Sequence, residues 1–217
     1  MRSVIMIDAI VKGMKPLTSD APVSSYLRDR HLDKVINLKG LNLGWNYLNY
    51  YCEYTRINHL LPTIIAPFTI GQSLKGIHRT FVDVSRLIIH KGKDKRMKGN
   101  MAGSAVRLWS GSSNIILVTE GIEDALSYWI CRFSLNEDVN VWAAGSSGGI
   151  KRLELPLWQS AEVFIGADMD KAGIAAANHL YGRIKENGWT AHIEPPFRKK
   201  DWNEYLSHSI ELEKEML

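Results

Sequence analysis

Three carboxylates follow two apolar segments of strand length. Glu120 comes directly after the run 115–119, and Asp168 and Asp170 follow the run 163–167. Acidic groups that meet at one place repel each other unless a cation lies between them. Oxygen ligands of this kind suit Mg²⁺, which shares the rest of its coordination shell with water and with substrate phosphates. The pattern therefore predicts a site for Mg²⁺, or for Mn²⁺, that handles phosphate groups.

The elements around these acids favour a parallel sheet. Apolar residues at helical spacing follow each acidic turn, namely Ile122, Ala125, Leu126 and Trp129, and then Ala172, Ala175, Ala176 and Leu180. Strand, acidic turn and helix, repeated, are typical of an α/β fold, whose ligands lie beyond the carboxyl ends of the strands. Gly121 and Gly173 allow close backbone approach beside the acids. Taken singly, Glu120 or Asp168 could instead be an acid that is favoured at a helix N-terminus.

Two further strands complete the expected sheet. The run 139–144 ends at a Gly/Ser loop, 145–149, whose backbone N–H groups can cradle phosphate although the loop matches no P-loop pattern. The run 191–194 leads to a basic stretch that ends at Asp201.

These motifs resemble a known family. Glu-Gly after one strand, Asp-x-Asp-x-Ala-Gly after another, and Lys-Asp-Trp-Asn-Glu at 200–204 are similar to the Toprim domain of DnaG-type primases and of phage or plasmid primase-like proteins. The resemblance covers about residues 24–206. It implies a parallel-sheet, Rossmann-like Toprim domain preceded by a smaller mixed α+β subdomain, the basal part of a primase polymerase core. The expected limits are 1–23 for an N-terminal helix and linker, 24–112 for the basal subdomain, and 113–217 for the Toprim domain with a C-terminal helix.

The resemblance also assigns roles. Glu120, Asp168 and Asp170 would be catalytic, and the same three acids with Asp201 would hold the metal. Phosphates of nucleic acid or nucleotide would contact basic residues, namely Arg79, Lys95, Arg96, Lys98, Lys171 and Lys200. The chain departs from the bacterial pattern at Asn203, where a second aspartate is usual. An asparagine offers a carbonyl ligand but no charge.

The N-terminal half gives weaker signals. We expect helices at 3–14 and 24–32, paired strands at 63–68 and 76–82, a basic run at 90–98, a connecting segment at 102–109, and a C-terminal helix at 207–217 that caps the sheet. The basic run could contact phosphate or form a solvated loop. The aromatic segment 41–59 has no assigned structure, and its rings could stack on bases or fill a small core.

Composition sets modest limits. The chain has 217 residues, 45% of them hydrophobic, and a net charge of +4, which is too small to indicate nucleic-acid binding by itself. Its two cysteines, Cys52 and Cys131, form no CxxC pair, which excludes a zinc ribbon and indicates a reducing, cytoplasmic compartment. No apolar run is long enough to cross a membrane.

The sequence therefore predicts Mg²⁺-dependent phosphoryl transfer on nucleic acid, with RNA primer synthesis on a single-stranded DNA template as the first interpretation. Nucleoside triphosphates would be the substrates, and a replicative helicase or a separate zinc-domain protein would be the partner. A Toprim nuclease, with water as nucleophile, needs the same carboxylates. A third alternative is a catalytically silent module that binds nucleic acid or a partner.

Overall fold

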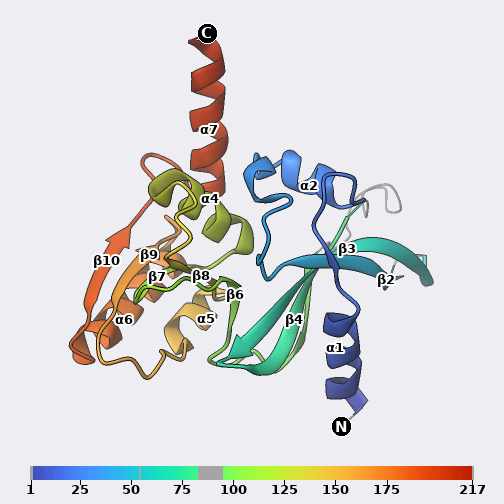
Figure 1. The fold of residues 1–217 in the computed structure, drawn as a ribbon, viewed down its shortest axis with the longest axis horizontal. Helices are drawn as coiled ribbons and strands as arrows, with labels where there is room; N and C mark the ends of the chain where they lie inside the picture. Colours follow the sequence, from blue (N-terminus) through green and yellow to red (C-terminus); the bar gives the residue numbers. More distant parts are fainter. Residues whose placement is uncertain (1, 54, 83–94, 217) are drawn as a thin grey trace.

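The computed structural model describes residues 2–53, 55–82 and 95–216 (Figure 1). The helices are α1 (Arg2–Lys12), α2 (Ser24–Arg28), the 3₁₀ turn η1 (Asp33–Val35), α4 (Ile122–Phe133), α5 (Ser147–Arg152), α6 (Lys171–Glu186) and α7 (Trp202–Glu215). The strands are β1 (Lys15–Pro16), β2 (Gly44–Cys52), β3 (Ile57–Ile70), β4 (Ser73–Phe81), β5 (Lys95–Gly99), β6 (Ala105–Trp109), β7 (Ile115–Thr119), β8 (Asn140–Ala143), β9 (Glu162–Gly166) and β10 (Thr190–Glu194).

The C-terminal half is the expected α/β layer structure. Its strands follow the order β6-β8-β7-β9-β10, in which β8, β7, β9 and β10 run parallel and β6 runs antiparallel to β8. Alternate residues of β7 enter different cores: Leu117 packs with α4, whereas Ile116 and Val118 pack with α6. Strands buried on both faces read as continuous apolar runs, which is why the sequence signal was clear here. The predicted parallel sheet is confirmed.

The N-terminal half is an antiparallel sheet of β2, β3, β4 and β5 with α1 on one face. Helix α1 packs Ile7 against Ile65 and Ile77. The paired strands expected at 63–68 and 76–82 correspond to the second half of β3 and to the later part of β4, which ends at Phe81. The unassigned segment 41–59 forms β2 and the start of β3, where Tyr50 is buried and Tyr47 and Tyr51 keep 43% and 44% exposure.

The segment expected to be a connection at 102–109 is instead strand β6, so that interpretation was wrong. Phe68 of β3 pairs with Val106, and Val106 also pairs with Ala143 of β8. Strand β6 thereby joins both halves into one ten-stranded sheet. Its five residues are too few to show the alternation that identifies a strand, and both of its faces are covered. The domain limit near 112 stays a prediction.

Several element limits differ from expectation. Lys95–Gly99 is strand β5, paired with β4, and its exposed residues alternate with partly buried ones. The earlier part of the basic run, 90–94, lies outside the described residues. Helix α2 ends at Arg28, and α7 begins at Trp202 and packs against α4 before it extends away from the body (Figure 1). None of the described helices is long and apolar enough to span a bilayer.

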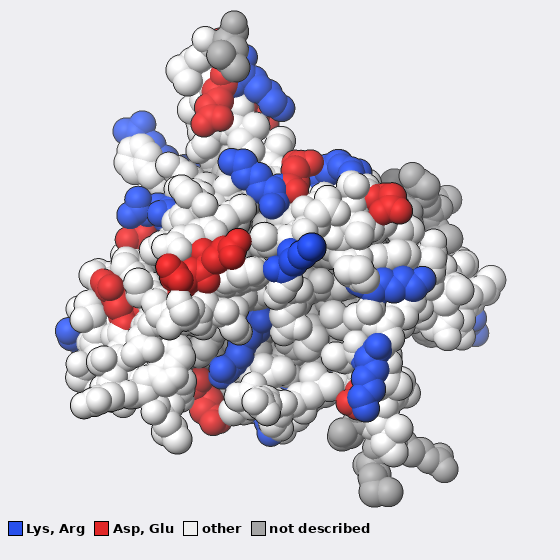
Figure 2. Space-filling view, viewed as in Figure 1, with Lys and Arg blue, Asp and Glu red and all other residues white. Residues whose placement is uncertain are grey.

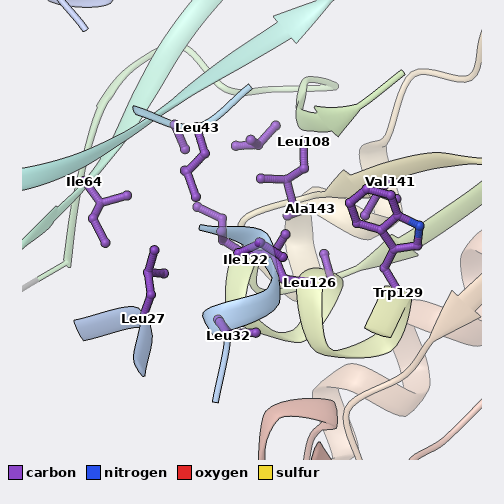
Figure 3. Packing of buried hydrophobic residues seen from close by; sticks show 14 of the residues in the cluster. Leu27, Leu32, Leu43, Ile64, Leu108, Ile122, Leu126, Trp129, Val141 and Ala143 are labelled. Atoms are coloured by element: carbon purple, nitrogen blue, oxygen red, sulfur yellow. The ribbon is translucent and has the colours of Figure 1, made fainter. Parts of the chain in front are cut away.

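The larger core lies between the sheet, α4 and the segment after α2. Figure 3 shows Leu27 and Leu32 on one side, Leu126 and Trp129 of α4 opposite, and Leu108 of β6 beside them. Because this core contains residues from both halves, burial there holds α4 against the N-terminal part of the chain.

The central place of β6 can be tested by stability. Leu108 has 0% exposure and Leu157 is fully exposed, at 104%. Leu108→Ala should lower the free energy of unfolding by about 2–5 kcal/mol, because it removes buried methyl groups and leaves a cavity. Leu157→Ala, the matched control, should change it by less than about 0.5 kcal/mol. Urea denaturation measures both, and equal effects would contradict the packing described here.

Candidate active site

The three predicted acids lie at one edge of the parallel sheet. Thr119, the last residue of β7, is in register with Gly166 of β9 and Ala143 of β8. Glu120 therefore leaves the sheet next to the start of the turn that carries Asp168 and Asp170. This is the carboxyl edge, where ligands of such sheets bind.

Glu120 is fixed to the neighbouring strand's loop. Its backbone carbonyl accepts a hydrogen bond from the Gly145 N–H at 2.8 Å. Its carboxylate accepts one from the N–H of Ser147, at the start of α5. The Gly/Ser loop thus places a backbone donor on this acid. Burial raises the pKa of Glu120 against the lowering effect of that hydrogen bond, and the charge of Asp170 raises it further.

The turn after β9 is set by helix α6. Asp170 is the N-cap of α6, and its Oδ1 accepts a hydrogen bond from the Gly173 N–H at 2.8 Å. A Cβ at Gly173 would lie 2.7 Å from the backbone oxygen and 2.8 Å from the Cβ of Asp168, so only glycine lets the helix start this close. One carboxylate oxygen of Asp170 is thus used to cap α6, whereas the carboxylate of Asp168 takes no part in the cap.

Asp201 reaches the site from the start of α7. Its Oδ1 accepts a hydrogen bond from the Glu204 N–H at 2.8 Å, and Glu204 Oε2 accepts one from the Lys200 N–H at 2.9 Å. The Met169 N–H donates to the carbonyl oxygen of Lys200 at 2.8 Å. These bonds connect the Asp168–Asp170 turn to the third acidic segment, so the two approach the same edge.

The sequence analysis missed a further acid, Asp124. It lies in the first turn of α4, four residues after Glu120, and its Oδ1 accepts a hydrogen bond from the Asn203 N–H at 3.2 Å. A Cβ at Gly121 would meet its carboxylate, which would have to shift. Burial, followed by the charge of Asp201, raises the pKa of Asp124 to about 6. Acids are common in the first turn of a helix, so the sequence carried little signal for a role of Asp124 in the site.

Asp168 is the electrostatic centre of the cluster. Burial raises its pKa to about 7, and the charges of four neighbours add to the shift, in the order Asp124, Glu120, Asp201 and Asp170. Its Oδ1 is buried and has no hydrogen-bond partner among the described residues. Uncompensated negative charge and an unpartnered oxygen fit a divalent cation. Within the described ranges, no three Asp, Glu, His or Cys side chains lie close enough together to hold a metal ion in their present positions.

Asn203 connects this cluster to neighbouring elements. Its Nδ2 donates to the Arg30 carbonyl oxygen at 2.9 Å and to Ser127 Oγ at 3.0 Å. The side chain thereby ties α7 to α4 and to the segment after α2.

The structure separates the basic residues of β5. Lys95 forms an ion pair with Glu123 Oε1 at 2.9 Å, and its charge lowers the pKa of Asp124, which places it beside the acidic cluster. Arg96 points to the other face of the sheet, where its guanidinium lies 4.2 Å from the ring centre of Tyr50 and donates to the Tyr51 carbonyl at 3.0 Å. Lys98 Nζ lies 3.0 Å from Met6 Sδ of α1.

The other predicted cations differ in burial. Arg79 lies opposite Arg96 on β4, half-buried, and its pKa is lowered by burial and then by the charge of Arg96. Lys171 and Lys200 are exposed, next to Asp170 and Asp201 in the sequence. Acidic and basic side chains are interspersed on the face shown in Figure 2, so no single field of one sign dominates it.

Comparison with known proteins assigns a family to the C-terminal half of the chain. Residues 115–210 match the Toprim domain family, so this part of the chain is a Toprim domain. A search of curated protein sequences finds no match.

Solved structures extend the likeness to the whole chain. The zinc-binding and RNA polymerase domains of Aquifex aeolicus primase align with 98% of this chain and 60% of their own, with 13% identity and a TM-score of 0.54. The RNA polymerase domain of Mycobacterium tuberculosis primase DnaG aligns with 93% of this chain and 77% of its own, with 12% identity and a TM-score of 0.52. The primase fragment of the bacteriophage T7 primase-helicase protein aligns with 79% of this chain and 66% of its own, with 16% identity and a TM-score of 0.50.

The chain thus spans less than two thirds of the T7 and Aquifex structures. At these identities the likeness establishes the fold, which is that of a primase RNA polymerase domain with a Toprim half. The resemblance inferred from the sequence motifs is confirmed.

The raised pKa of Asp168 predicts how stability depends on pH. A buried acid whose folded pKa lies near 7 and whose unfolded pKa lies near 4 binds a proton more tightly when folded, so stability is lost as pH rises through this window. Asp168→Asn should remove that loss. In EDTA at pH 8 it should gain on the order of 1 kcal/mol after solvent screening, or about 2–4 °C in Tm.

Thermal unfolding between pH 5 and pH 8 measures this gain. Mg²⁺ should raise the Tm of the original protein at pH 8 and should not raise that of the variant. An Asp168→Asn protein less stable than the original at pH 8 would contradict the repulsion.

Proposed function

We propose that this protein is a Mg²⁺-dependent, primase-like nucleotidyltransferase that makes RNA primers on a single-stranded DNA template. The observation that carries the proposal is the unpartnered, buried oxygen of Asp168 among four further carboxylates, at the carboxyl edge of a Toprim sheet. A cluster of this charge is costly without a cation, and the cation suits phosphate substrates.

The acidic residues would have two roles, metal binding and proton transfer. Asp168, Asp170 and Asp201 would hold Mg²⁺, and Asp124 would complete the acidic surround. When bound, the ion supplies charge neutralisation for the phosphates of the incoming nucleotide and for the leaving group. Glu120 would accept the proton of the attacking 3′-hydroxyl, and its raised pKa suits a base that works near neutral pH.

Cations around the edge would bind phosphate without reading sequence. We propose that Lys95 of β5 binds phosphate, since its ammonium lies beside the acids. We propose the same role for Lys171 and Lys200, which are next to Asp170 and Asp201 in the sequence. Arg79, Arg96 and Lys98 occupy the other face of the N-terminal sheet, so any phosphate contact of theirs would lie farther along the nucleic acid.

The partners follow from the compared structures. One is a fragment of a primase-helicase protein, and another contains a zinc-binding domain together with the polymerase domain. We therefore propose that this chain works with a replicative helicase or with a zinc-binding module that engages the template.

Glu120→Gln tests the chemistry. The variant keeps size and hydrogen bonding but loses the base, so primer synthesis should fall about 10²–10⁴-fold. The assay combines single-stranded DNA, labelled ribonucleotides and Mg²⁺, with a Tm measurement to confirm folding.

The products of that assay separate the alternatives. Short labelled RNA supports the primase, whereas shortened DNA indicates a Toprim nuclease. A protein that gains Tm from Mg²⁺ but makes neither product is a binding module. An unchanged rate in Glu120→Gln would return this acid to a merely structural place at the end of β7.

Lys171 and Lys98 form a matched pair for the phosphate contact to the template. Binding of single-stranded DNA should weaken with salt, and each lost phosphate contact should flatten the log–log slope by about 0.7. Lys171→Ala, next to the acidic turn, should show this change, whereas Lys98→Ala, whose ammonium lies against α1, should leave the slope near its original value. Fluorescence anisotropy across a salt series measures both, and the reverse order would move the path of the nucleic acid to the α1 side.

A further inference from the structure

Glu123 is a buried carboxylate with no place in the mechanism above. It lies in the first turn of α4, next to Asp124, and is only 9% exposed. A charge in such a position is tolerated only when it is paired and hydrogen-bonded. Its Oε1 accepts a hydrogen bond from the Tyr26 hydroxyl at 2.6 Å and contacts Lys95 Nζ at 2.9 Å.

These contacts join three separate elements. Tyr26 belongs to α2, Lys95 opens β5, and Glu123 belongs to α4. Within the described part of the chain, the other ion pairs each stay inside one half: Asp8–Lys12 and Arg28–Asp33 in the N-terminal half, and Arg132–Glu194 and Glu162–His192 in the Toprim half. The Lys95–Glu123 pair is the one among them that crosses from the N-terminal half to the Toprim domain.

The pair also fixes where the ammonium lies. A lysine at a strand end has a flexible four-carbon stem and carries three donors. One donor is directed to Glu123, and the side chain of Lys95 remains 42% exposed, so donors stay available to solvent. The ammonium is close enough to Asp124 to lower that acid's pKa, and Asp124 acts in turn on Asp168. The Lys95 ammonium therefore lies at the rim of the acidic cluster.

We propose that Glu123 is a positioning residue that holds the Lys95 ammonium at the rim of the carboxylate site, where it binds a phosphate of the incoming nucleotide. Tyr26 steadies Glu123 from the other side. This inference rests on the proposed function and adds a specific device to it: a buried carboxylate outside the metal site orders the cation that meets the triphosphate. Ordering the lysine beforehand lowers the entropy lost when the nucleotide binds.

Steady-state kinetics with Glu123→Ala, Lys95→Ala and the double variant test it. Each single variant should raise KM for the nucleotide on the order of tenfold and change kcat much less, because a charge-assisted contact to the bound phosphate is lost. The double variant should be no worse than Lys95→Ala alone, since both changes remove one contact. Glu123→Gln keeps an acceptor oxygen for Tyr26 and Lys95 and should recover most of the loss.

Tyr26→Phe gives a variant that keeps the ion pair and removes one hydrogen bond to Glu123. It should raise KM in the same direction, by about two- to threefold, and it keeps the test usable if Glu123→Ala fails to fold. An unchanged KM in Tyr26→Phe together with a non-folding Glu123→Ala would assign Glu123 to folding alone and overturn the inference. Single-variant effects that multiply in the double variant would overturn it too, as would a fall in kcat with KM unchanged.

Equilibrium binding of Mg-ATP to the same variants distinguishes this inference from the proposed function. A protein that makes no primer but binds ATP, more weakly in Glu123→Ala and Lys95→Ala, retains the positioning role and loses the primase activity. A protein that makes primers with the same KM in every variant retains the activity and loses the positioning role. A protein that binds no nucleotide loses both.

Discussion

Mutual repulsion among carboxylates at the carboxyl edge of the Toprim sheet is the constraint on which the arrangement of the chain depends. Side chains from β7, α4, the turn after β9 and the start of α7 are brought together although their charges oppose it. Hydrogen bonds resist the repulsion: the Gly173 N–H holds Asp170, the Glu204 N–H holds Asp201, and the Ser147 N–H holds Glu120. These hydrogen bonds order the turns that carry the acids, and a bound cation would reduce the repulsion among the carboxylates.

The N-terminal half of the chain lies beside this edge and contributes one cation to it, Lys95. Its sheet buries one set of aromatic and arginine side chains, with Arg96 lying over Tyr50, and turns Lys95 to the opposite face. The alternation of side chains along a strand makes this division unavoidable, because neighbours on β5 must point to opposite faces. Basic residues that are neighbours in the sequence therefore lie on opposite faces of the sheet.

The sequence was informative where burial and chemistry coincide. The limits of β7 were predicted to the residue, since an apolar run ended at an acid, and the Glu-Gly and Asp-x-Asp motifs led to the Toprim assignment. Asp124 was missed because an acid in a first helical turn is ordinary. Strand β6 was missed because five residues covered on both faces show no period, and the pairing of Phe68 with Val106 is a long-range property that no local pattern contains. The hydrogen bonds of the Asn203 amide nitrogen could not be predicted, because its partners, Arg30 and Ser127, come from distant parts of the chain.

The position of β6 has a mechanical consequence. Strand β6 is bonded on one side to β3 and on the other to β8, so the two halves share a backbone ladder and not merely a surface. Pulling them apart would break strand pairing and open the core around Leu108 and Trp129. Any change in the relative position of the two halves would therefore have to distort or break this pairing, so the ladder couples the place of the N-terminal sheet to that of the carboxylate edge.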